Sequence, residues 1–127
     1  MREEIRVPGL APPFSHYTDA VRVDDLLFVS GCIAVDAEGN LVGGDDVVAQ
    51  ARQVFANLGA VLAAAGATFA DVAKVTVFLV DIDDRVRINP VREEYFGETM
   101  PASTLVEVGS LVLPGAKVEI ELVVRIP

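Results

Sequence analysis

Hydrophobic and polar residues alternate most clearly in two stretches near the end of the chain, residues 100–108 (MPASTLVEV) and residues 117–125 (KVEIELVVR). Successive side chains of a β-strand point to opposite faces of a sheet, so the pattern predicts two strands. Each strand carries a glutamate, Glu107 or Glu119, on the face opposite its more obvious apolar residues. We expect the two strands to be neighbours, so that these carboxylates line either a polar cleft or a solvated sheet surface.

The first third of the chain predicts an arm followed by a hairpin. Residues 1–15 hold three prolines, which favour an extended or looped arm over a helix. Two apolar runs separated by Asp24 and Asp25 are typical of a β-hairpin. Residues 36–46 are rich in glycine and aspartate, and they predict a loop with glycines at positive φ.

The middle of the chain predicts two helices with a strand between them. Apolar residues recur at helical spacing between a cap at Asp45 or Asp46 and a terminating Gly66, which predicts a long helix. Residues 71–80 (DVAKVTVFLV) are β-branched and apolar on both faces, as in a central strand. Asn89 and Pro90 resemble a cap with proline in the first turn, so we expect the second helix to begin there. Residues 81–88 would then form a separate helical turn.

The order β-β-α-β-α-β-β predicts a single α+β domain over residues 1–127, with two helices on one face of one sheet. The second face of the sheet is also apolar along the central strand, and Leu105 and Val123 continue it. Large exposed apolar patches are rare on monomers. We therefore expect other copies of the chain to bury this face, with a polar cleft at the junction between subunits.

Charge narrows the possible partners. The chain has 19 acidic and 10 basic residues and a formal charge of −9. This charge disfavours binding to nucleic acid or anionic membranes, and no basic run offsets it. The arm lacks the apolar core of a signal peptide, and we expect no run close to the roughly 18 residues of a membrane span. We predict a cytoplasmic protein.

The cysteine count and the absence of known motifs limit the disulfides and cofactors that we expect. Cys32 is the only cysteine, so it forms no internal disulfide, and we interpret it as a small core residue. The sequence contains no Cys/His cluster at metal-binding spacing and no nucleotide-binding motif, so we expect neither a metal nor another cofactor.

Four stretches taken together resemble the RidA (YjgF, imine deaminase) family across nearly the whole chain: SHYTDAVRVDDLLFVSG, VVAQARQVFANLGAVLAAAGATFADVAKVTVFLVDIDDRVRIN, MPASTLVEV and KVEIELV. The resemblance implies a chorismate-mutase-like fold and a homotrimer whose sheets line a central barrel, with clefts between subunits. It also implies hydrolysis of short-lived enamines and imines, such as 2-aminoacrylate and 2-iminopropanoate, to 2-keto acids and ammonia without a cofactor.

The sequence departs from this family at the substrate-binding motif. The deaminating branch carries an arginine two residues after the proline of its PAR motif, and this arginine binds the substrate carboxylate through paired hydrogen bonds. Here Ser103 occupies that position, and Leu105 replaces a frequent cysteine. Serine supplies neither the charge nor the fork, so we expect weaker binding of small 2-imino acids. Four arginines are either replacements or plain surface charges: Arg22, Arg85, Arg87 and Arg92.

Other positions match the family more closely. The resemblance places Glu119 on the glutamate thought to orient water or shuttle a proton, Tyr17 on the cleft tyrosine, and Gly31 on a tight glycine of the first hairpin. Asn89 matches the asparagine at the second helix, where a helix cap is the simpler explanation. The only histidine, His16, is either a solvated loop side chain or a group that titrates near neutrality in the cleft.

Three functions are consistent with the sequence. The first is an enzyme that hydrolyses an enamine, imine or related electrophile, in which Glu119 guides water and Ser103, Tyr17 and in one version His16 bind the substrate. The second is a small-molecule-binding or regulatory homotrimer without catalysis. The third, ribonuclease activity, is disfavoured because the acidic chain lacks a basic patch and an aromatic stacking platform.

Overall fold

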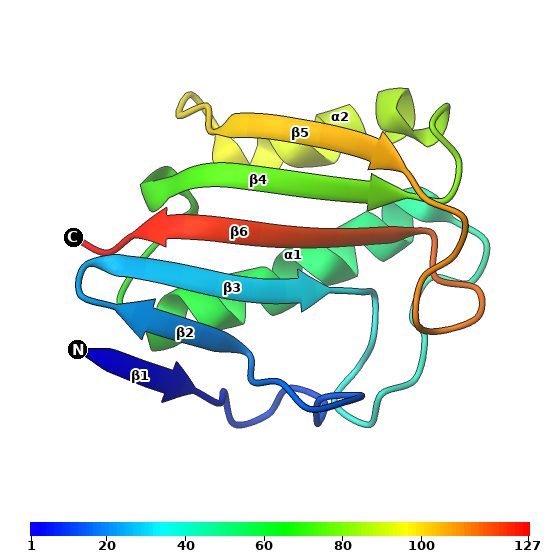
Figure 1. Cartoon of the computed structure of the whole chain (residues 1–127). Coiled ribbons are helices and arrows are strands. Elements are labelled where there is room, and N and C mark those ends of the chain that lie inside the picture. The colour runs from blue at the N-terminus through cyan, green and yellow to red at the C-terminus, as the bar shows by residue number, and fades with distance from the viewer.

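The computed structural model describes residues 1–127, which form one sheet with helices packed against it. The elements in chain order are β1 (Arg2–Ile5), β2 (Ala20–Val23), β3 (Leu26–Cys32), α1 (Val47–Ala64), the short 3-10 helix η1 (Phe69–Asp71), β4 (Val72–Leu79), α2 (Asp84–Phe96), β5 (Ala102–Glu107) and β6 (Val118–Arg125). The six strands lie in the order β1-β2-β3-β6-β4-β5 (Figure 1). Neighbouring strands are antiparallel except for the parallel pair β4 and β5.

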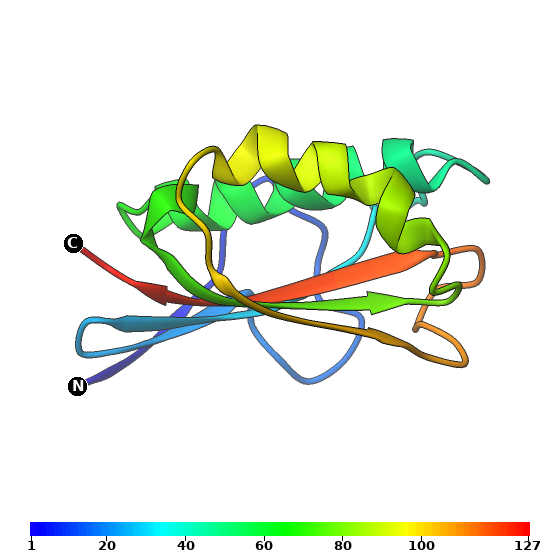
Figure 2. The same ribbon diagram turned by 90° about the horizontal axis from the view of Figure 1, so that it is seen from above.

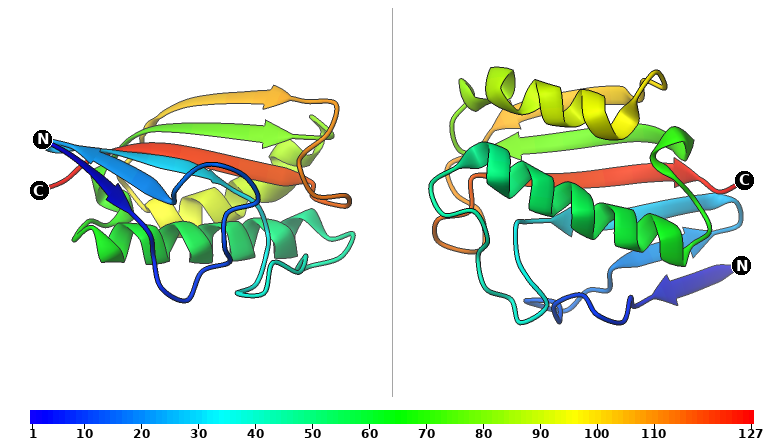
Figure 3. Two further views of the ribbon diagram at one scale, coloured as in Figure 1. Left: turned by 60° about the horizontal axis from the view of Figure 1, so that its bottom comes forward. Right: turned by 180° about the vertical axis from the view of Figure 1, so that it is seen from behind.

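Both helices cover the same face of this sheet, and the opposite face carries no helix (Figures 2 and 3). The predicted α+β class, with two helices on one face of a single sheet, is confirmed. Helix α1 packs across β3 and β6, and α2 packs beside it. Between the helices and the sheet lies a continuous core of 25 buried apolar residues.

Helix α1 begins and ends where the sequence predicts. Asp46 is the N-cap, and its carboxylate accepts hydrogen bonds from the backbone N–H groups of Val48 and Ala49 at 2.9 and 3.3 Å. Gly66 adopts φ 75° just beyond the last turn, in the left-handed region that glycine occupies without strain. The expected apolar stripe faces the sheet, and its centre, Phe55 and Leu58, is fully buried.

Helix α2 begins earlier than predicted. It runs from Asp84 with Pro90 inside it, so Asn89 is not its N-cap and residues 84–88 belong to the regular helix. Proline removes one backbone donor and usually bends or breaks a helix. Here Ile88 and Val91 are buried on either side of the proline, and their packing holds the helix together through it. The local capping signal was therefore misleading, because tertiary burial stabilises the turn that proline weakens.

The amino-terminal arm contains a strand that the proline content hid. Strand β1 pairs antiparallel with β2 and forms one edge of the sheet. The predicted hairpin follows as β2 and β3, joined at Asp24, whose φ is 52°. The proline-rich segment after β1 is looped, as expected, and leads back to β2.

The two carboxylates expected to share a cleft lie on opposite faces of the sheet. Strand β4 separates β5 from β6, so the two carboxylate-bearing strands are not neighbours. Glu107 is in register with the buried Leu79 and faces the helices, where it accepts a hydrogen bond from the backbone of Ile82. Glu119 is in register with Phe78 and faces away from them. Alternation within each strand was predicted correctly, but the face of β5 that carries Glu107 turns toward the helices, whereas the face of β6 that carries Glu119 turns away from them.

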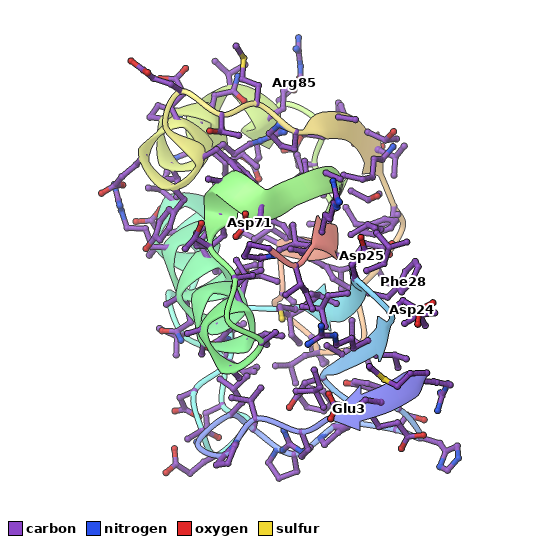
Figure 4. All side chains as sticks on the ribbon, turned by 90° about the vertical axis from the view of Figure 1, so that its left-hand side faces the viewer. Glu3, Asp24, Asp25, Phe28, Asp71 and Arg85 are labelled. Carbon is purple, nitrogen blue, oxygen red and sulfur yellow. The ribbon has the colours of Figure 1, made fainter.

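The uncovered face is apolar near its centre. Phe28 of β3 is in register with Val123 of β6 and with Val21 of β2. Phe28 is 45% exposed and points away from the helices (Figure 4). Val106 on β5 is also exposed. The expected second apolar face is therefore present at Phe28, Val106 and Val123, whereas Leu105 packs against the core on the helix side.

The expectation that no apolar run approaches the length of a membrane span is wrong for helix α1. Its 18 residues have a mean hydropathy of 1.3, which meets the length and composition of a span. Half of the helix is buried against the sheet, as in the core helix of a globular domain. The pattern is thus explained by packing within the chain.

A buried glutamine on α1 ties three segments together. Gln50 is fully buried, and its amide group donates to the carbonyls of Gly44 and Gly115 at 2.7 and 2.9 Å. Its carbonyl accepts from the backbone N–H of Lys117 at 2.8 Å. The side chain therefore joins the loop before α1 to the start of β6.

We predict that Gln50→Ala lowers the free energy of unfolding by about 2–4 kcal/mol, because three backbone groups lose their buried partner. Urea denaturation at pH 7 measures the change. Gln53→Ala is the matched control on the same helix, since Gln53 bonds only to the Asn57 side chain. Equal losses in the two variants would show that Gln50 has no special structural role.

Candidate functional site

A β-bulge in β3 makes room for the carboxylate of Glu119. Val29 pairs with Leu122 and Cys32 with Ile120, so β3 has one more residue than β6 between these pairs. The bulge contains Gly31, and a Cβ added there would lie 2.4 Å from Oε2 of Glu119. Glycine at position 31 therefore leaves the space that the end of the Glu119 side chain occupies, and a larger residue there would displace that carboxylate.

Glu119 and Gly31 line a pocket whose other wall is the proline-rich arm. Residues 10–14 form that wall, and Tyr17 and the end of β3 complete the lining with Asn57 and Val112. The cavity volume is about 80 Å³. Drug-sized ligand sites typically measure ~300–1,000 Å³, so within one chain the pocket holds only a very small molecule.

The arm is held against the sheet by Arg6 and Asp19. The Arg6 guanidinium forms an ion pair with Asp19 and donates to the carbonyl of Ala11 at 2.8 Å. Asp19 also accepts from the backbone N–H of Val7 at 2.7 Å. These contacts position the proline-rich wall of the pocket relative to β2.

Tyr17 keeps a donor available at the pocket. Its hydroxyl accepts a hydrogen bond from the backbone N–H of Phe14 at 3.1 Å, and its side chain is 45% exposed. The phenolic proton is not used in that bond, so it can be donated to a bound molecule.

Glu119 is a partly buried carboxylate without a hydrogen-bond partner in the chain. Burial raises its pKa above the ordinary glutamate value, and repulsion from Glu121 on the same strand adds to the shift. A carboxylate with a raised pKa and free oxygens can accept a proton from water and return it within the same reaction.

Cys32 also lines the pocket but is not a nucleophile at neutral pH. Burial raises the pKa of its thiol to about 12, and the nearby carboxylates of Asp19 and Glu119 add to the effect. The thiol stays protonated, and Cys32 packs against the core. This agrees with its interpretation as a small core residue.

Ser103 and Leu105 lie away from this pocket. Both are on β5, at the opposite edge of the sheet from β1, and their side chains face the helix side. Ser103 accepts a hydrogen bond at 2.8 Å from Nη2 of Arg92 on α2. Leu105 packs against the core. Neither residue contacts Glu119 within one chain.

Asn89 and His16 are also outside the pocket lining. Asn89 is exposed within α2, and His16 is exposed beside Tyr17. The chain therefore brings together Glu119, Tyr17 and Gly31, and it keeps Ser103, Leu105, Asn89 and His16 elsewhere.

The sequence analysis did not predict two features of the structure. The proline-rich arm forms a wall of the pocket, and the paired prolines just before Tyr17 are the signal that would have indicated a rigid segment there. The contact between Arg92 and Ser103 joins residues 11 positions apart on different elements, and no local pattern indicates it.

Comparison with known proteins identifies the family and agrees with the fold. The family model described as endoribonuclease L-PSP matches residues 9–126. The 3-aminoacrylate deaminase RutC of Acinetobacter baylyi is 38% identical over 127 residues, covering 99% of this chain and 100% of that protein. The human 2-iminobutanoate/2-iminopropanoate deaminase is 39% identical over 119 residues, covering 93% of this chain and 83% of that protein.

A solved structure matches the whole fold. The crystal structure of the yeast protein YEO7 superposes with a TM-score of 0.95 at 31% identity, covering 100% of both chains. Sequence, fold and family model agree over nearly the full length, and the chain therefore belongs to the RidA/YjgF family, whose model carries the description endoribonuclease L-PSP.

Proposed function

We propose that this protein hydrolyses a small enamine or imine to a carbonyl compound and ammonia, with Glu119 as the acid–base group. The observation that carries the proposal is the free, partly buried Glu119 carboxylate in a small pocket opposite Gly31. The deaminases among its relatives support the reaction class.

The chemistry needs only one such group. The substrate reacts as its protonated imine, and Glu119 takes a proton from water as the water oxygen bonds to the imine carbon, which gives a neutral carbinolamine. The carboxyl group then passes that proton to the amine nitrogen. As the C–N bond breaks, Glu119 takes up the hydroxyl proton, so a carbonyl forms, ammonia leaves, and the ammonia finally carries the proton away as ammonium. Imines are reactive electrophiles, and positioning of water with one acid–base group is sufficient catalysis. The reaction requires no cofactor or metal.

The active assembly is proposed to be a homotrimer with sites between subunits. Ser103 lies on the β5 edge of the sheet, far from the pocket of its own chain. Two different surfaces that meet head to tail give a closed ring when the rotation between copies is a simple fraction of a turn, such as a third. Such a ring would also bury the exposed apolar face around Phe28. We place the protein in the cytoplasm, where a lone thiol such as Cys32 stays reduced.

Turnover of 2-aminoacrylate, generated by a dehydratase and followed as loss of the imine, tests this function for the wild type, Ser103→Arg and Glu119→Ala. Wild-type turnover that Glu119→Ala abolishes supports the proposal. Activity only in Ser103→Arg would mean that the native substrate lacks the carboxylate. If the wild type and Ser103→Arg are both folded trimers and both inactive, the non-catalytic binding function is favoured. Cleavage of RNA without deamination would favour the ribonuclease function.

The raised pKa of Glu119 leads to a pH prediction. A catalytic base must be ionised, so kcat/KM should rise with pH through the pKa of Glu119, above the ordinary glutamate range. Glu121→Gln removes the repulsion that contributes to the shift, so this rise should move to lower pH while the maximal rate is kept. A pH–rate profile of both proteins measures the displacement, and a kcat/KM that does not rise with pH above the ordinary glutamate range would contradict the role of Glu119.

The Glu119 carboxylate should increase activity but decrease the stability of the fold at neutral pH. We predict that Glu119→Gln lowers kcat/KM about 100-fold or more. It should also be more stable than the wild type at pH 7, because it removes a charge that burial disfavours.

The sign follows from linkage. Below about pH 4 the glutamate is protonated in both folded and unfolded chains, so the two proteins differ little. As pH rises through the raised folded pKa, the wild type loses stability and the advantage of Glu119→Gln grows. Urea denaturation across this range measures the difference, and a wild type that is more stable at pH 7 than at pH 4, relative to the variant, would contradict it.

Gly31→Ala tests the space behind the carboxylate. The new methyl group would displace the end of the Glu119 side chain, so we predict a loss of kcat/KM of about 10- to 100-fold with little loss of stability. Gly109→Ala is the matched control, because nothing lies within 4 Å of a Cβ there. Kinetics and urea denaturation of both variants measure the effects, and equal activities would show that the clearance at Gly31 is not functional.

A further inference from the structure

We propose that Arg92 on α2 binds the substrate carboxylate of the proposed reaction, replacing the arginine that the family carries at the position of Ser103. The inference rests on the function proposed above for the pocket of a neighbouring copy. It assigns the carboxylate-binding role to a different element, α2 in place of β5.

The contact with Ser103 is the first support. Nη2 of Arg92 donates to the Ser103 hydroxyl at 2.8 Å, so the guanidinium lies next to the position that the family's arginine occupies in sequence. Serine is short and leaves room beside β5, and the Arg92 side chain reaches into that room from the helix. Ser103 is then a positioning residue, since it accepts one hydrogen bond and orients the guanidinium.

The lack of a counter-ion is the second support. Five arginines of the chain form ion pairs with carboxylates: Arg2, Arg6, Arg52, Arg87 and Arg125. Arg92 is half-buried and has no acidic partner, although the chain has 19 acidic residues. Burial lowers its pKa, which is the expected effect on a cation without a partner. Such a guanidinium gains by binding an anion.

The remaining donors of Arg92 are available for that anion. No buried side-chain nitrogen or oxygen in the chain lacks a hydrogen-bond partner, so the nitrogens that do not bond to Ser103 reach the surface. A guanidinium has five N–H donors in a planar fork, and one bond to serine leaves enough of them for a bidentate carboxylate.

The other candidate arginines are less suitable. Arg22 lies on β2, which three strands separate from β5, and it donates to the carbonyl of Asp24. Arg87 is paired with Asp84, and Arg85 is exposed and projects away from the body of the molecule (Figure 4).

The pocket itself needs a cation from outside. Its lining contains no lysine or arginine, and of its two carboxylates Asp19 is already paired with Arg6, whereas Glu119 has no cationic partner. An anionic substrate beside Glu119 would be repelled unless a positive charge faces it. Arg92 and this pocket lie in separate parts of one chain, so the charge must come from the Arg92 of a second copy, whose β5 edge meets the pocket.

Steady-state kinetics with 2-aminoacrylate and competitive inhibition by pyruvate and by its neutral amide test the assignment. Arg92→Ala should raise KM and the inhibition constant of pyruvate about 10- to 100-fold, with a smaller change in kcat and no change for the amide. Arg92→Lys should give an intermediate loss because the charge stays and the fork is removed. Arg85→Ala on the same helix is the control and should match the wild type.

Moving the arginine from position 92 to position 103 tests whether one guanidinium at either position is enough to bind the carboxylate. Arg92→Ser combined with Ser103→Arg should restore pyruvate binding that Arg92→Ser alone loses. Turnover that is unaffected by Arg92→Ala and Arg92→Lys would overturn the role of Arg92 while leaving the deaminase function intact. Pyruvate binding that depends on Arg92 in a protein without turnover would support Arg92 and reject the deaminase function.

Discussion

Packing of helices on one face only is the constraint from which the rest of this structure follows. Helices α1 and α2 together bury the inward residues of β3, β4 and β6, and Leu58, Val77 and Ile120 are fully excluded from solvent. Two helices cannot cover both faces, so every outward strand residue is left to solvent or to another molecule. The carboxylate of Glu119 and the ring of Phe28 are both on that uncovered face.

Within this frame, one irregularity creates the pocket. Gly31 lies in the bulge of β3 opposite Glu119, and because glycine has no side chain it leaves space for the carboxylate. The resulting space is small and is closed by the arm that Arg6 holds in place. Burial there raises the pKa of Glu119 at a cost in stability. Such a local cost is common where a group is kept ready for proton transfer.

Charge is divided between two distant surfaces of the chain. The pocket holds the free carboxylate of Glu119, and Arg92, a partly buried cation without a counter-ion, lies behind β5. Neither surface alone suits an anionic substrate that must be hydrolysed. Under the function proposed above, a head-to-tail assembly would place Arg92 of one copy beside Glu119 of the next. Ser103 in the family motif is then compatible with carboxylate binding.

The sequence by itself determined the elements with strong periodicity: α1 with its cap at Asp46, the hairpin β2–β3, and the alternation of β6 that puts Glu119 opposite its buried neighbours. These depend on residues close in the chain. Only the tertiary structure decided that α2 continues through Pro90, that β4 separates the strands of Glu107 and Glu119, and that Arg92 meets Ser103. Those outcomes depend on which distant surfaces pack together, and local periodicity contains no information about that packing.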